Sequence, residues 1–118
     1  MINEFFDIRE FDSPDAPGSG ENMRVELITR LSEARRFAGV PFKINSGYRT
    51  KNRNMLVGGA PGSSHLGGWA ADIACRDGLS RQKILTALIQ AGFKRIGIAA
   101  TFIHCDCDPS KKPSIWLY

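Results

Sequence analysis

Apolar residues recur every three or four positions in two stretches of the chain, and this spacing predicts two amphipathic helices. The first covers about residues 21–38 and ends at Gly39. The second covers about residues 81–91, with Ser80 as its N-cap. The inward-facing residues are predicted to be Met23, Leu27, Leu31 and Ala34 in the first helix and Ile84, Leu85, Leu88 and Ile89 in the second.

Shorter runs alternate between apolar and polar residues, which is typical of strands with one buried face. Stretches rich in Gly, Pro and Ser at residues 12–20 and 50–64 predict loops. This order of elements predicts one α+β domain over residues 1–118, with a largely antiparallel sheet and helices packed on one side. The predicted strands are residues 42–49, residues 68–75, "RIGIAA", "TFIHCDCD" and a last edge strand, "SIWLY".

Composition narrows the class of protein only a little. A length of 118 residues suits one domain, and the net charge of +4 mildly favours anionic partners. The charges are dispersed, with no stripe of basic and aromatic residues, so we expect no nucleic-acid partner. We also expect a monomer. Three cysteines without a CxxC pair do not indicate a disulfide framework and are expected to be buried thiols.

Nothing in the sequence predicts a membrane partner or a secretory leader. No run approaches the roughly 18 apolar residues that a membrane span needs. The first residues, "MINEFFDIREF", contain acids from residue 4 and lack a long apolar segment, so no signal peptide is expected. We therefore expect synthesis in the cytoplasm.

The only two histidines, His65 and His104, both lie close to aspartates in strand-like sequence. Asp72 follows His65 by seven residues, in "SSHLGGWAADI", and shares a strand face with small alanines. His104 and Asp106 share one face of "TFIHCDCD", whereas the neighbouring cysteines take the other. If both strands lie in one sheet, these side chains gather on one side. Two histidines and one aspartate are a sufficient ligand set for zinc.

The motifs "SGYRT", "SSHLGGWAADI" and "FIHCDCD" occur in an order that resembles a known family. The chain is similar to the zinc D-Ala-D-Ala carboxypeptidases and peptidoglycan endopeptidases of peptidase family M15, in particular to the small single-domain members of bacteriophages and bacteria. The resemblance implies the hedgehog/DD-peptidase-like fold. It also implies that Zn²⁺ is held by His65, Asp72 and His104.

Further roles follow from the same resemblance. Arg49 matches the family arginine near the substrate, which would stabilise an oxyanion or hold a substrate carboxylate. Ser63 matches a serine that helps to position the substrate. Tyr48 could line the site or could equally be an aromatic residue of the core or rim.

The chain departs from the better-known members in one respect. They carry an acid a few residues before the last histidine, whereas "GIAATFI" precedes His104 here. Asp106 is the best candidate for the catalytic general base, because it lies on the same strand face. It could equally be a partner that orients a ligand or pairs with Arg49. Asp108, next to Pro109, is expected to be a turn residue.

The sequence therefore predicts a zinc metallopeptidase that hydrolyses a D-Ala-containing or other stem-peptide bond of peptidoglycan, as a carboxypeptidase or as an endolysin-type endopeptidase. The alternative is a zinc-containing module of the same fold that binds the cell wall without catalysis. Either protein would act on the wall after release from the cell or as part of a phage particle.

Overall fold

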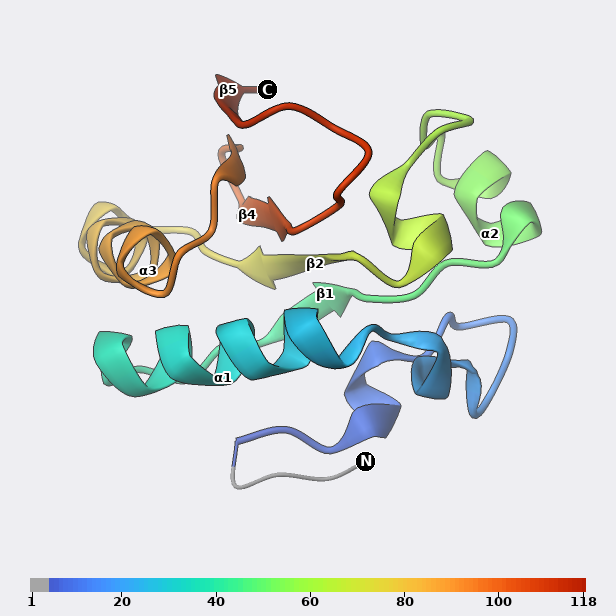
Figure 1. The fold of residues 1–118 in the computed structure, drawn as a ribbon, viewed down its shortest axis with the longest axis horizontal. Helices are drawn as coiled ribbons and strands as arrows, with labels where there is room; N and C mark the ends of the chain where they lie inside the picture. The colour runs from blue at the N-terminus through green and yellow to red at the C-terminus, as the bar shows by residue number, and fades with distance from the viewer. Residues whose placement is uncertain (1–4) are drawn as a thin grey trace.

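A five-stranded sheet with the strand order β1-β2-β4-β3-β5 organises the computed structural model, which describes residues 5–118 (Figure 1). Only the β3–β5 pair is parallel, so the prediction of an α+β fold with a largely antiparallel sheet is confirmed. The strands are β1 (Ile44–Ser46), β2 (Ala70–Ala74), β3 (Arg95–Ile98), β4 (Phe102–Asp106) and β5 (Ser114–Leu117).

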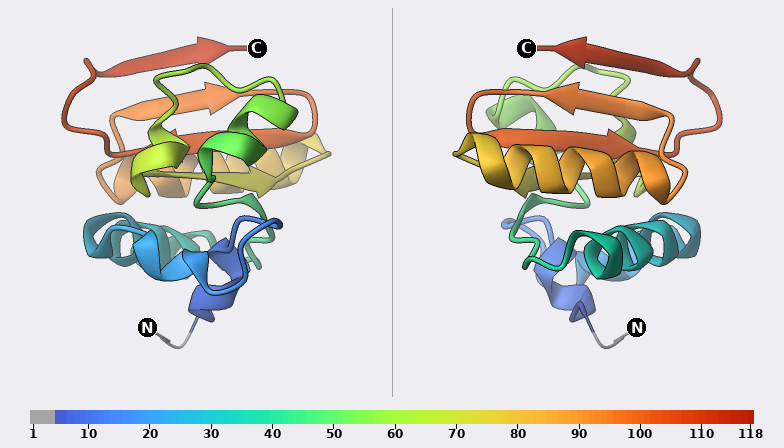
Figure 2. Two further views of the ribbon diagram at one scale, coloured as in Figure 1. Left: turned by 90° about the vertical axis from the view of Figure 1, so that its right-hand side faces the viewer. Right: turned by 90° about the vertical axis from the view of Figure 1, so that its left-hand side faces the viewer.

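The two long helices, α1 (Val25–Ala38) and α3 (Gly78–Gln90), pack against one face of the sheet through a shared apolar core. The short helix α2 (Lys51–Leu56) and the 3-10 turn η3 (Ser64–Gly67) lie on the other side of the sheet from α3 (Figure 2). Two more 3-10 turns, η1 (Ile8–Phe11) and η2 (Ser19–Asn22), precede α1. The core therefore occupies one face and leaves the other to α2, η3 and polar side chains.

The helix periodicity identified most of the core. Leu27, Leu31 and Ala34 of α1 are buried, as is Met23 just before this helix. Ile84 and Leu88 of α3 are buried as well. Ile89 was predicted to face inward, but it is 52% exposed and Ala87 is buried instead. One helical step turns a side chain by about 100°, so the stripe through positions 84, 87, 88 and 91 leaves position 89 outside.

The strand predicted over residues 42–49 is shorter, because only Ile44–Ser46 forms β1 beside β2. Three predictions for helices and loops are also wrong, each because a local cap or turn defines the element. The first helix begins at Val25, since residues 19–22 form η2. The second begins at Gly78, because the N-cap is Asp77, whose carboxylate accepts a hydrogen bond from the Ser80 backbone N–H. The predicted loop 50–64 contains α2, whose N-cap is Thr50.

The expected burial of the cysteines is confirmed for two of them. Cys75 and Cys105 are buried in the core, and Cys107 is half-buried against it. Burial raises the pKa of the Cys107 thiol to about 11, so the thiolate is disfavoured at neutral pH. Within residues 5–118, none of the helices has the length and apolar character required to cross a bilayer.

Candidate metal centre

His65, Asp72 and His104 meet on the sheet face opposite the core. Asp72 of β2 lies directly across from His104 of β4, and η3 supplies His65. All three are at most 7% exposed, and one ligand atom from each lies within 4.8 Å of the others. The strand parity deduced from the sequence thus places two of these side chains side by side, and the turn brings in the third.

Both imidazoles point at the same carboxylate oxygen. The Nε2 atom of His65 lies 3.2 Å from Asp72 Oδ1, and the Nδ1 atom of His104 lies 2.9 Å from it. Burial acts to raise the pKa of Asp72, but hydrogen bonds from the two histidines outweigh it and hold that pKa well below its ordinary value. The carboxylate is therefore ionised and ready to bind a cation.

The remaining nitrogen of each ring has its own acceptor. His65 Nδ1 donates to the Gly47 carbonyl oxygen at 2.7 Å, and His104 Nε2 donates to Asp106 Oδ2 at 2.7 Å. Metal-ligating histidines are oriented in this way, with the second N–H held by a carbonyl or carboxylate. Loss of the protons that face Asp72 would free both lone pairs on the same side, and the three donors then fit a divalent metal such as zinc.

Gly47 explains why glycine follows serine in "SGYRT". A Cβ atom at this position would lie 2.8 Å from the Cα atom of Phe11, which is backbone and cannot move aside. The absent side chain lets the segment pack against η1, and Tyr48 N–H donates to the Phe11 carbonyl. The Gly47 carbonyl is thereby held where His65 needs its acceptor.

Ser63 serves the same turn. Its hydroxyl accepts a hydrogen bond from the His65 backbone N–H and so caps η3. The predicted contact of Ser63 with substrate remains a prediction. The neighbouring Ser64 is 4% exposed and donates to Asp108, which also forms the turn expected of it by accepting from the N–H of Ser110.

Arg49 lies at the β1 side of the cluster. Its guanidinium donates to Ser46 Oγ at 3.0 Å and to Asn54 Oδ1 at 3.2 Å, and one nitrogen lies 3.4 Å from Asp72 Oδ2. Its side chain is only 16% exposed. The ion pair with Asp72 brings a fixed positive charge to the cluster.

Asn54 is a site residue that sequence analysis missed. It is 3% exposed, and its amide donates to the Ala60 carbonyl while its oxygen accepts from Arg49. Asn54 therefore links α2 to the loop that contains Ala60 and holds the Arg49 guanidinium in place. The available signal was Thr50, a good N-cap residue, which would have turned the predicted loop into a helix with Asn54 on it.

Asp106 lies behind His104, on the side away from Asp72. One oxygen accepts from His104, and the other forms an ion pair at 2.8 Å with Arg95. The possible pairing of Asp106 with Arg49 is wrong, because Arg49 reaches β1 and β2 whereas Arg95 stands beside Asp106 in the register of β3 and β4. Burial acts to raise the pKa of Asp106, but His104 and Arg95 lower it below 3.8, so the carboxylate is charged.

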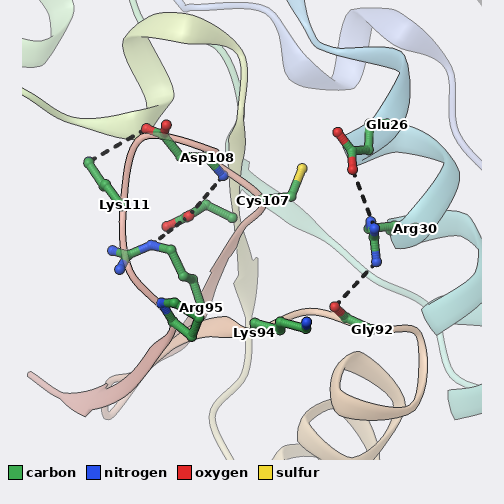
Figure 3. Close-up of a pocket in the computed structure, with 10 residues that line it drawn as sticks. Glu26, Arg30, Gly92, Lys94, Arg95, Cys107, Asp108 and Lys111 are labelled. Carbon is green, nitrogen blue, oxygen red and sulfur yellow. Dashed lines mark hydrogen bonds and ion pairs between the residues drawn. The ribbon is translucent and has the colours of Figure 1, made fainter.

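Two cavities border the site. Tyr48, Ser46 and Arg49 line one of about 180 Å³. The other, of about 210 Å³, adjoins Asp106 (Figure 3). Most of its cations are engaged, as the dashed lines show for Arg30 between Glu26 and Gly92 and for Lys111 beside Asp108. This second cavity adjoins the candidate metal centre, because Asp106 lines the cavity and contacts His104.

Comparison with known families agrees with this geometry. The sequence model of the peptidase M15 family, described as "Peptidase M15", matches residues 9–106. The match covers most of the chain, so the chain belongs to the peptidase M15 family. A search of curated proteins finds no match. Membership supports a peptidase, and the buried His–Asp–His cluster is compatible with the metal on which such peptidases typically depend.

Proposed function

We propose that this protein is a zinc-dependent peptidase that hydrolyses an amide bond in the peptide stems of bacterial peptidoglycan. The observation that carries the proposal is the arrangement of the two imidazoles. Each has one nitrogen tied to an acceptor of its own, and the other turned toward the Asp72 carboxylate. Three protein ligands leave a coordination position open, as catalytic zinc sites require.

A Zn²⁺ ion bound by His65, Asp72 and His104 would supply a Lewis acid and lower the pKa of its bound water to near neutrality. Neighbouring side chains supply the charge around this ion. Arg49, held by Ser46 and Asn54, places a positive charge beside Asp72, where it would stabilise an oxyanion or bind a substrate carboxylate.

For Asp106 we propose that it orients His104 and is not the general base. Both of its oxygens are engaged, and it contacts the nitrogen of His104 that faces away from Asp72. A general base must come within hydrogen-bond distance of the proton it removes, and Asp106 is 1% exposed behind the imidazole. Its carboxylate would keep His104 in the tautomer that binds metal.

The peptidoglycan substrate rests on the motif resemblance and on family membership. A D-Ala-containing bond is the expected target, and the protein would reach the wall after release from the cell or as part of a phage particle. It would act as a monomer. A mildly basic surface, with a net charge of +4, suits an anionic wall.

Mass spectrometry of soluble products from purified peptidoglycan tests the proposal. The zinc-loaded protein should release new fragments whose masses identify the bond. Chelator-treated protein and a His65→Ala variant are the controls, and neither should release them. If the loaded protein binds the wall and releases nothing, it is the non-catalytic module, which the engaged Asp106 and the missing upstream acid would then explain.

A further inference from the structure

Arg95 of β3 lies behind Asp106, one step further from the candidate metal centre. In the register of the sheet, Arg95 pairs with Asp106 of β4. The Nε atom of Arg95 donates to Asp106 Oδ1 at 2.8 Å, and Asp106 Oδ2 accepts from His104 Nε2 at 2.7 Å. The side chain of Asp106 is 1% exposed and that of Arg95 is 18% exposed. A continuous series of charged hydrogen bonds therefore leads from Arg95 to a candidate ligand.

The orientation of the Asp106 carboxylate depends on this ion pair. A buried carboxylate needs a partner for each oxygen, and the two oxygens of Asp106 face different groups. The backbone N–H of Asp108 also donates to Oδ1, at 3.2 Å. The bond from the charged guanidinium is shorter and stronger than this one. Loss of Arg95 should therefore let the carboxylate turn and weaken its hydrogen bond to His104.

Arg95 is itself held by β5 and by the loop that precedes this strand. Its Nη1 atom donates to the Lys112 carbonyl oxygen at 2.6 Å. Its guanidinium lies 4.9 Å from the centroid of the Trp116 ring, in a cation–π contact. A planar guanidinium can make both contacts together with the ion pair to Asp106, whereas the single ammonium group of a lysine cannot.

Gly97 of β3 makes room for the Trp116 ring. Gly97 pairs with His104 on one side and with Trp116 on the other. A Cβ atom at Gly97 would lie 2.6 Å from ring atoms of Trp116, so the ring lies over the glycine. The ring centroids of Trp116 and His104 are 5.4 Å apart, close enough for contact. The indole therefore contacts both Arg95 and the candidate ligand that Arg95 reaches through Asp106.

We propose that Arg95 is a positioning residue of the metal centre: it holds Asp106 in the orientation that fixes the His104 ring, and β5 in turn holds Arg95. This proposal rests on the proposed zinc site and deepens it. The family match ends at residue 106, so Lys112 and Trp116 lie outside the matched region. The last strand of the chain thus supports a metal ligand that it does not itself provide.

Zinc affinity, measured by competition with a chelating dye, tests the proposal without any substrate. Arg95→Gln should lower the affinity about tenfold, the lower end of the range for groups that orient ligands. Arg95→Lys should restore only part of this loss, because lysine keeps the charge without the planar fork. Trp116→Leu should lower the affinity about threefold, through loss of the cation–π contact. Arg81→Gln is the control, since Arg81 donates to the Ala100 carbonyl at the opposite end of β3 and β4 from Asp106.

A double-mutant cycle distinguishes positioning from a general loss of stability. In the Asp106→Asn background, Arg95→Gln should have little further effect on zinc affinity, because Arg95 acts through Asp106. Ile96→Val, a fully buried change next to Arg95, should lower stability and leave the zinc affinity of the folded protein unchanged. Additive losses in the cycle, or wild-type zinc affinity in Arg95→Gln, would overturn the proposal.

A second readout does not need the metal. The chain has only two histidines, so a His65→Ala variant assigns their ring N–H protons in NMR spectra. The Nε2–H proton of His104, bonded to Asp106, should exchange slowly with water, and Arg95→Gln should weaken its resonance through faster exchange. If the wild-type protein binds no zinc, the proposed function fails and this resonance alone decides on Arg95. An unchanged resonance in Arg95→Gln would then rule out the positioning role.

Discussion

The two faces of β2 and β4 are buried to a similar extent but are stabilised in opposite ways. On the core face, Ala71, Ile73, Ile103 and Cys105 are fully buried among apolar side chains. On the site face, Asp72, His104 and Asp106 are at most 7% exposed and depend on one another's charge.

The difference shows what each face requires. Burial of an apolar side chain is favourable in itself, and close packing sets its contribution. Burial of a charge is costly unless a partner compensates it. Here the partners are Arg49, Arg95 and the two histidines. The core face should therefore govern folding, and the site face should govern metal binding and its pH dependence.

The largest effect is expected from Asp72→Ala, which removes the oxygen that both imidazoles contact. Activity should fall by more than about 100-fold, beyond the range for groups that merely orient ligands. Zinc stoichiometry, measured on the purified variant, should drop with it, while the circular dichroism spectrum stays native. A variant that kept one tightly bound zinc per chain would show that the ligand set is wrong.

Ile103→Ala tests the opposite face of β4, one residue from His104. Loss of a fully buried isoleucine should lower the free energy of unfolding by about 2–5 kcal/mol, measured by urea denaturation. The folded fraction should still bind one zinc, because the ligands stay in place. A loss of zinc affinity without loss of stability would contradict the division between the faces.

Asp106→Asn separates the two roles of this carboxylate. If it positions His104, zinc affinity should fall about 10–100-fold, measured by competition with a chelating dye. If it is the general base, kcat should fall while zinc affinity stays unchanged. Asp108→Asn is the control, since Asp108 bonds Ser64 and Ser110 and contacts no candidate ligand.

Arg49→Lys keeps the positive charge but loses the planar guanidinium, whose three nitrogens contact Ser46, Asn54 and Asp72. We expect kcat/KM to fall about 10- to 100-fold, because a hydrogen bond to a charged group contributes about 1.5–3 kcal/mol. Arg53→Lys on α2 provides the control and should be near wild type. Equal effects of the two variants would show that Arg49 has no specific role in the site.

The smallest effect concerns the pH dependence of stability in the zinc-free protein. Burial opposes the charge on His104, but Asp106 and Asp72 raise its pKa above 6.5. The stabilisation of the folded state by protonated His104 is complete below pH 6.5 and is lost as the pH rises through the raised pKa. Asp72 and Asp106 have lowered pKa values, so their contribution is present above pH 3.8 and is lost as pH falls further.

Thermal unfolding across this range should therefore show a maximum between these limits. Ile103→Ala should lower the whole curve without changing its shape, because no charge on the site face is altered. A curve that flattened in Ile103→Ala would show that the two faces are coupled.

The sequence by itself determined the features that follow from local periodicity. Alternation along "GWAADIAC" and "TFIHCDCD" separates the acids and His104 from the cysteines, because successive strand residues point to opposite faces. The helical spacing around Leu27 and Leu31 likewise marks the buried stripe of α1. These relations hold within one element, so no knowledge of its neighbours is needed.

Only the tertiary structure decided which elements meet. The sequence does not show that Asp106 pairs with Arg95, that Asn54 braces Arg49, or that β5 adds in parallel beside β3. Each of these depends on strand order and register, which long-range packing determines. The position of Trp116 beside His104 follows from the same register and from the space that Gly97 leaves open.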